Sequence, residues 1–210
     1  MERTIRVKGT GKAKAEADQV TLNFTLSTID LEYEQAFNQM EKSQADFRST
    51  MERLGFEKDS VKSTEFTVDE NYESIGKREV FTGFEITHQM QVSFDFSSQR
   101  LAEVLSALKK GLANPSIQIS FSTKDQDGLK KRILQNAVQN AREKAEIIAA
   151  ASGCSLGEIL NIDYSWEEVD FESDFRYCGL EKSSYKSAPM EINPKDIEAA
   201  DTVSIIWGIK

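Results

Sequence analysis

The chain has 210 residues, 26 of them basic and 35 acidic, and a formal net charge of −9. Hydrophobic residues make up 39% of the chain, which suits a folded core and excludes global disorder. The acidic balance argues against binding nucleic acid, whose phosphates need clustered Lys and Arg, and no apolar run approaches the ~20 residues that span a bilayer. We therefore expect neither a nucleic-acid partner nor membrane insertion.

Strand and helix periods follow one another in the order β-β-α-β-β-α-β-α-β-β. Alternation of apolar and polar residues predicts strands near residues 5–9, 20–27, 61–72, 84–96, 117–121, 158–169 and 203–209. Apolar stripes at helical spacing predict helices over residues 33–54, 97–112 and 124–152. Gly55 and Gly153 suit the left-handed residue past a helix end, and Thr123 with Gln126 fits a capping box.

These elements predict an α+β fold, in which a mixed, mainly antiparallel sheet carries the long helices on one face. Each helix has a single apolar side, so one sheet face is enough to bury it. The order also suggests two βαββ-like units, 17–96 and 115–210, joined by the short helix 97–112 within one domain, 1–210. The segment Glu172–Met190 has no periodicity and is predicted to be a long loop.

The third helix carries a row of small residues four positions apart. They are Ala137, Ala141, Ala145 and Ala149. Alanine lets a neighbouring element approach closely, and two interpretations stay open at this point. The row either packs on the sheet of its own chain or forms a helix contact between subunits.

No catalytic or metal-binding set is evident in the sequence. His88 is the only histidine, and it falls on the apolar side of its strand, which indicates a structural role. Gly9-Thr10-Gly11 lacks the third glycine and the following helix of a dinucleotide-binding loop. We therefore predict no enzyme activity, no catalytic residue, no metal and no cofactor.

An acidic run with interleaved aromatic residues is the candidate docking site for a partner protein. Its members are Trp166, Glu167, Glu168, Asp170, Phe171, Glu172 and Asp174. The two cysteines, Cys154 and Cys178, match no zinc spacing and are expected to be free thiols. They offer an alternative, redox-active role.

Three stretches resemble the SIMPL-domain family. The first is Ile5-Arg6-Val7-Lys8-Gly9-Thr10-Gly11 with Asp18-Gln19-Val20. The second runs from Ala137 through Lys144-Ala145 to Gly153 and Leu156-Gly157. The third is Ala188-Pro189-Met190-Glu191-Ile192-Asn193-Pro194, followed by Val203-Ser204-Ile205-Ile206-Trp207. Together they span nearly the whole chain.

The resemblance implies a modest set of functions. Members of the family include an immunogenic periplasmic protein that forms ring-like or channel-like oligomers, an adaptor associated with an innate-immunity kinase, and a protein linked to oxidative-stress tolerance. We therefore expect a non-enzymatic, oligomeric scaffold or binding protein. The alternatives are a stress-protective protein that uses its cysteines and a signalling adaptor that docks through the acidic-aromatic run.

The expected location is the cytoplasm, because no apolar signal segment follows Met1 in the chain as given. The periplasm or cell envelope is the alternative if a signal has been removed.

Overall fold

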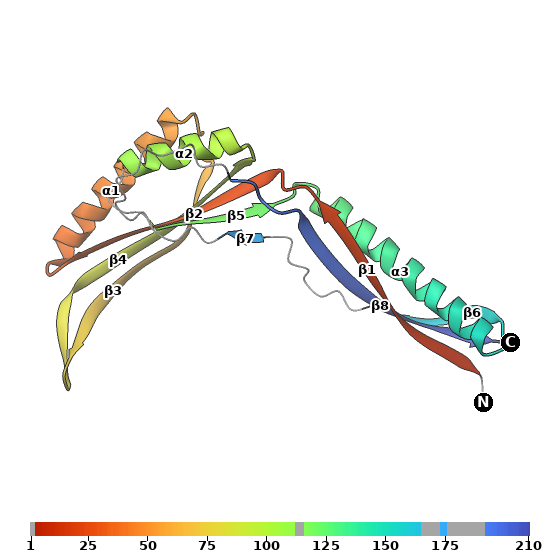
Figure 1. Ribbon diagram of the computed structural model, residues 1–210. Helices are drawn as coiled ribbons and strands as arrows, with labels where there is room; N and C mark the ends of the chain where they lie inside the picture. The colour runs from red at the N-terminus through yellow and green to blue at the C-terminus, as the bar shows by residue number, and fades with distance from the viewer. Residues whose placement is uncertain (1–2, 112–115, 165–172, 176–191) are drawn as a thin grey trace. The chain divides into compact units, whose positions relative to one another are not determined.

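The computed structural model describes residues 3–111, 116–164, 173–175 and 192–210 (Figure 1). The strands are β1 (Thr4–Ala15), β2 (Gln19–Asp30), β3 (Val61–Ile75), β4 (Arg78–Asp95), β5 (Ser116–Ser122), β6 (Leu156–Asp163), β7 (Ser173–Phe175) and β8 (Ile197–Ile209). The helices are α1 (Tyr33–Arg53), α2 (Ser98–Gly111) and α3 (Gln126–Ala151). The α+β class is confirmed, and β7 adds a short strand inside the predicted loop 172–190.

The strands form two sheets where the sequence pattern suggested one mixed sheet. The three-stranded sheet has the order β1-β8-β6, and the five-stranded sheet has the order β3-β4-β2-β5-β7. The pairs β1–β8, β6–β8, β2–β4 and β3–β4 are antiparallel. Alternation of side chains marks a strand but does not select its neighbour, which is why the division between sheets was not predictable.

By contact, the chain divides into two compact units. Unit 1 comprises Met1–Ala17, Ser122–Ser173 and Lys195–Lys210, and unit 2 comprises Asp18–Phe121 and Asp174–Pro194. Within unit 2 the elements β2, α1, β3 and β4 follow one another, with strand order β3-β4-β2. Unit 1 repeats this arrangement with β1, α3, β6 and β8 and strand order β6-β8-β1. The repeat hypothesis expected β5 to be the first strand of the second unit, but in the structure β1 pairs with β8 in that position. The single-domain and repeat assignments stay predictions.

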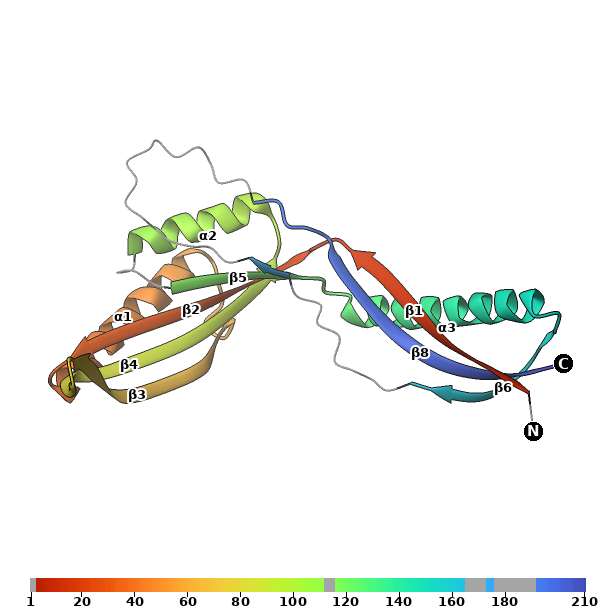
Figure 2. The ribbon, with the colours of Figure 1, turned by 60° about the horizontal axis from the view of Figure 1, so that its bottom comes forward.

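In unit 2 the helices α1 and α2 lie on one face of the sheet (Figure 2), and large buried side chains fill the core between them. The residues of β2 that alternate inward, Val20, Leu22, Phe24 and Leu26, are buried as the pattern predicted. Phe24 meets Phe47 of α1 edge to face, with ring centroids 5.0 Å apart. Large apolar side chains therefore set the spacing between helix and sheet in this unit.

Unit 1 is packed with small residues instead. The row Ala137, Ala141, Ala145 and Ala149 is buried, and its first three members share a core with Val7, Val203, Ile205 and Trp207 of the sheet. Opposite the row stand Gly9 and Gly11 of β1. A Cβ atom built on Gly9 would lie 2.6 Å from the Cβ of Ala141, and one on Gly11 would lie 2.5 Å from the backbone nitrogen of Ala137. Neither position has room for a side chain, so α3 lies directly on β1.

The helix ends agree with the sequence in part. Gly55 and Gly153 follow α1 and α3 with φ of 80° and 68°, the left-handed conformation that was predicted. The capping box was wrong. Asp125 caps α3 by accepting a hydrogen bond from the Gly128 N–H, and Thr123 lies two residues before this cap.

Candidate functional site

His88 lies on β4, the neighbour of the edge strand β3 in unit 2. It is 5% exposed and stands in register between Leu26 of β2 and Phe66 of β3, so the predicted burial is confirmed. Its Nε2 lies 2.8 Å from the Ser63 Oγ, and the Phe66 ring meets it edge-on at 5.4 Å between centroids. Burial lowers the pKa of His88 below its usual value, and the positive charge of Arg48 lowers it further. The imidazole is therefore neutral at neutral pH.

The Ser63–His88 pair has the distance of a nucleophile and its general base. A hydrolytic triad also needs a carboxylate on Nδ1 to orient the imidazole. Within the described part of the chain, Nδ1 of His88 has no hydrogen-bond partner. The pair thus fits a buried histidine tied to one strand better than a catalytic device. Sequence reasoning missed Ser63, because the register shift between Ser63 and Glu65 hides its pairing.

A small cleft opens beside this pair, at the end of α1 and the start of β3. Its volume is about 200 Å³. It is lined by Arg48, Met51, Glu52, Phe56, Glu57, Lys58, Asp59, Val61, Ser63 and Met90. Small-molecule sites usually measure about 300–1,000 Å³ and are mostly apolar. The size and the mixed charge of this cleft do not indicate a particular ligand.

A row of five aromatic side chains runs from the β3–β4 hairpin to the start of α1. We call it the aromatic row; in order, its members are Tyr72, Phe81, Phe84, Tyr33 and Phe37. Successive ring centroids lie 5.6, 5.2, 5.7 and 6.2 Å apart. Tyr72 is 49% exposed and Tyr33 is 47% exposed. Ile29 and Leu31, which precede α1, and Ile75 and Val80, which flank the hairpin turn, are also exposed.

Local structure explains why the exposed Tyr33 and Tyr72 join the half-buried Phe37, Phe81 and Phe84 in one row. The turn into α1 is held by Asp30, whose carboxylate accepts hydrogen bonds from the Glu32 N–H and from the Gln39 amide, and this places Tyr33 at the first turn. In the hairpin, a register shift between Asn71 and Tyr72 pairs Tyr72 with Phe81. The sequence pattern placed Tyr33 and Phe37 in a helix and Tyr72 and Phe84 in strands, but it did not include Phe81. The row depends on the register shift and on the β2–α1 turn.

The candidate site residues predicted from the sequence fall into three groups. Ala137, Ala141, Ala145 and Ala149 are covered within the chain, as described above, which leaves them no face for a second subunit. Trp166, Glu167, Glu168, Asp170, Phe171 and Glu172 lie outside the described residues, as does the side chain of Asp174, whose backbone belongs to β7. Cys178 also lies outside them. Cys154 is a half-buried free thiol, with its Sγ 3.6 Å from the Ser152 carbonyl oxygen.

The described ranges contain neither a cluster of metal-ligating side chains nor a membrane-crossing helix. No group of three or more His, Cys, Asp or Glu side chains comes together there as a metal site. None of the described helices combines the length and the apolar character that crossing a membrane requires.

The described chain has an α+β fold with two sheets and an aromatic row whose two tyrosines are exposed. The chain belongs to the SIMPL family, described as a protein of unknown function (DUF541), whose model matches residues 5–207. It is 21% identical over 204 residues to the uncharacterized protein YggE of Edwardsiella ictaluri (strain 93-146). That match covers 96% of this chain and 84% of the relative.

Proposed function

We propose that this protein is a non-enzymatic scaffold that assembles with copies of itself and binds a partner protein. The aromatic row is the observation that carries the proposal. Exposed apolar patches of this kind mark interaction sites, and aromatic side chains are enriched in the buried centres of interfaces. Tyr33 and Tyr72 combine an apolar ring with a polar hydroxyl group, which suits a surface that meets water when free and protein when bound.

The chemistry of the described residues supports a binding role over catalysis. The Ser63–His88 pair lacks an orienting carboxylate in the described part of the chain, and the adjacent cleft is smaller than a typical substrate site. A scaffold needs an exposed binding surface, and we assign that part to the aromatic row.

Solution mass with surface variants tests the proposal. We expect the wild-type chain to elute as an oligomer by size exclusion with light scattering, and the Tyr33→Glu/Tyr72→Glu double variant to shift toward the 23.7 kDa monomer. The control is Val138→Glu, which places a charge at an exposed apolar position of α3 in unit 1, outside the aromatic row, and should leave the mass unchanged. A wild-type chain that stays monomeric on concentration would contradict the scaffold.

The redox alternative rests on Cys154, a free thiol in the described structure. A thiol used in redox chemistry reacts faster than an ordinary one, because its thiolate is stabilised. Thiol titration of wild type and Cys154→Ser at several pH values measures this. Fast, Cys154-dependent labelling below pH ~7 would favour the redox role.

A further inference from the structure

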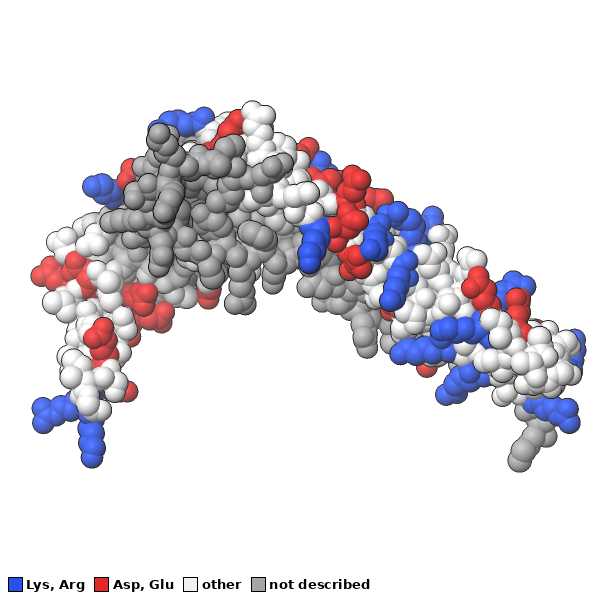
Figure 3. All heavy atoms as spheres, viewed as in Figure 1, with Lys and Arg blue, Asp and Glu red and all other residues white. Residues whose placement is uncertain are grey.

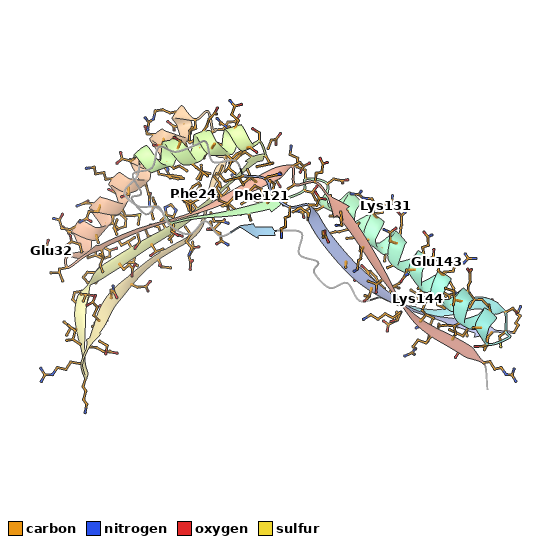
Figure 4. The ribbon with its side chains drawn as sticks, viewed as in Figure 1. Phe24, Glu32, Phe121, Lys131, Glu143 and Lys144 are labelled. Atoms are coloured by element: carbon orange, nitrogen blue, oxygen red, sulfur yellow. The ribbon has the colours of Figure 1, made fainter. Side chains whose placement is uncertain are left out.

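The outer edge of β1 in unit 1 is closed by side chains of α3. Three residues at four-residue spacing bond the backbone of alternate β1 residues. The Asn136 amide donates to the Lys12 carbonyl at 2.9 Å, the Thr10 N–H donates to the Asn140 Oδ1 at 3.0 Å, and the Lys144 Nζ donates to the Lys8 carbonyl at 3.1 Å. Figure 4 shows Lys144 on the side of α3 toward β1, with Lys131 and Glu143 pointing away from the sheet.

This closure depends on the small residues described above. Because Gly9 and Gly11 carry no side chains and the facing row is alanine, the helix axis lies close to the strand. The short amide groups of Asn136 and Asn140 can then reach backbone atoms that would otherwise be open to another strand. Edge strands are commonly protected from unwanted pairing by such covering elements.

Among the described residues, no helix side chain closes β6, the opposite edge of the same sheet, in this way. Along β8, the Ile209 N–H bonds Arg3 on the β1 side, whereas Lys210 exchanges two hydrogen bonds with Ser155 on the β6 side. Ser204 and Ile206 therefore face β6, where Asp163 and Asn161 stand opposite them. It follows that the N–H and carbonyl of Ile162 point outward. Among the described residues, β6 is the last strand of its sheet.

The side chains of β6 do not protect its edge either. Ile159, Leu160 and Ile162 are 51%, 42% and 54% exposed. The strand contains no proline and no Lys or Arg, the residues that commonly block edges. Its charged residues are Glu158 and Asp163, and both are exposed. An apolar, acidic edge with outward backbone groups is suited to pairing with a further strand.

We propose that the outer edge of β6 binds an extended, basic segment of a partner protein as a fourth strand of the sheet. The backbone groups would supply affinity, and the side chains would select a segment that alternates apolar residues with Lys or Arg. A second copy of this chain offers such a pattern in Ile5-Arg6-Val7-Lys8, but there α3 closes the edge of β1. The basic side chains over α3 and β1 are visible in Figure 3. The exposed carboxylates of Glu158 and Asp163 disfavour a second β6 edge of like charge and favour a basic segment of a different protein.

The inference deepens the binding part of the proposed function and rests on it, but not on the aromatic row. The probe is a fluorescent peptide of about ten residues in which valine alternates with lysine, and its matched control carries glutamate in place of lysine. Fluorescence anisotropy at low salt should show binding of the basic peptide about tenfold tighter than that of the acidic peptide, from two exposed ion pairs.

Two variants test the position of the site. Glu158→Lys/Asp163→Lys should reverse the preference between the two peptides, a result that an unfolded variant would not give. Ile162→Pro removes an outward N–H and should abolish binding of the basic peptide, with circular dichroism confirming the fold. Hydrogen exchange should show new protection at Ile162 when the basic peptide is added.

The possible outcomes separate this inference from the proposed scaffold. Equal binding of both peptides, or protection at β3 instead of β6, would overturn the edge proposal. A mass reduced to the monomer by Ile162→Pro would also overturn it, since a second copy would then occupy the edge. A monomeric chain that binds the basic peptide at β6 would support the edge proposal and contradict self-assembly through the aromatic row.

Discussion

The two units place a helix on a sheet in opposite ways, although their strands and helices follow the same order. In unit 2, Phe24 of β2 and Phe47 of α1 fill the space between the layers with large rings. In unit 1, Gly9 of β1 faces Ala137 and Ala141 of α3, and the backbone of the helix packs closely against the backbone of the strand. The comparison shows that one topology accommodates both large and small side chains between helix and sheet, provided that the facing residues of the two elements are of matching size.

The difference in spacing has a consequence for the strand edges. Where small residues bring α3 onto β1, polar side chains of the helix reach the backbone of the edge strand. In unit 2 the edge strand is β3, and long stretches of it are exposed. Close packing of α3 on β1 thus protects one sheet edge of unit 1. Variants of the small residues in unit 1 and of the large residues in unit 2 should show how each unit depends on its own packing.

The largest effect is expected from Gly9→Val. A Cβ at this position lies 2.6 Å from the Cβ of Ala141 and also meets backbone that cannot give way. We expect unit 1 to lose its packing, at a cost of more than about 4 kcal/mol, measured by denaturant unfolding followed by the fluorescence of Trp166 and Trp207 together. The control is Gly208→Ala, whose Cβ would meet only the Leu160 Cδ1 at 3.8 Å. Equal unfolding midpoints for the two variants would show that α3 and β1 are not tightly packed.

Phe47→Ala tests the large-residue core of unit 2. Phe47 is fully buried against Phe24, so truncation removes apolar contacts and leaves a cavity. We expect a loss of about 3–5 kcal/mol in the free energy of unfolding. Phe47→Leu keeps most of the volume and should cost clearly less. If both substitutions cost the same small amount, the space between α1 and β2 does not depend on the rings.

Asn140→Ala tests the closed edge of β1. The substitution leaves the half-buried Thr10 N–H without its acceptor, and we expect a loss of about 1–3 kcal/mol together with faster exchange of the Thr10 amide. Gln139→Ala, on the exposed side of the same turn, should change stability by less than about 0.5 kcal/mol. Unchanged exchange at Thr10 would mean that Asn140 does not protect the edge.

The smallest effect concerns the titration of His88. Its pKa is lowered in the folded protein, so the unfolded chain binds the proton first as the pH falls. The stabilisation is complete above the unfolded pKa of about 6.5 and decreases as the pH drops through that value toward the folded pKa. We expect His88→Phe to fold and to lose this part of the pH dependence, measured as unfolding free energy between about pH 7.5 and 5. Identical pH profiles for variant and wild type would contradict the assignment.

Much of the local structure was predictable from residue periodicity. Val20, Leu22, Phe24 and Leu26 alternate strictly, and all four are buried in β2 as expected. The alanines of α3 recur every four residues, which identified a helix with one close-packed face. The exposed aromatic row was not predictable, because Tyr72 and Tyr33 are brought together only through Phe81 and Phe84.

By itself, the sequence determined the type and approximate place of most strands and helices and the apolar side of the helices, because period and side-chain size are local properties; β7 was not predicted. Only the tertiary structure decided that β1 pairs with β8, from Thr4 opposite Gly208 to Ala15 opposite Ile197, and that Ser63 reaches His88. These choices depend on the free energy of contacts between segments far apart in the chain. This free energy arises when the apolar faces of a helix and a sheet are buried against each other, so it cannot be read from one segment of the sequence.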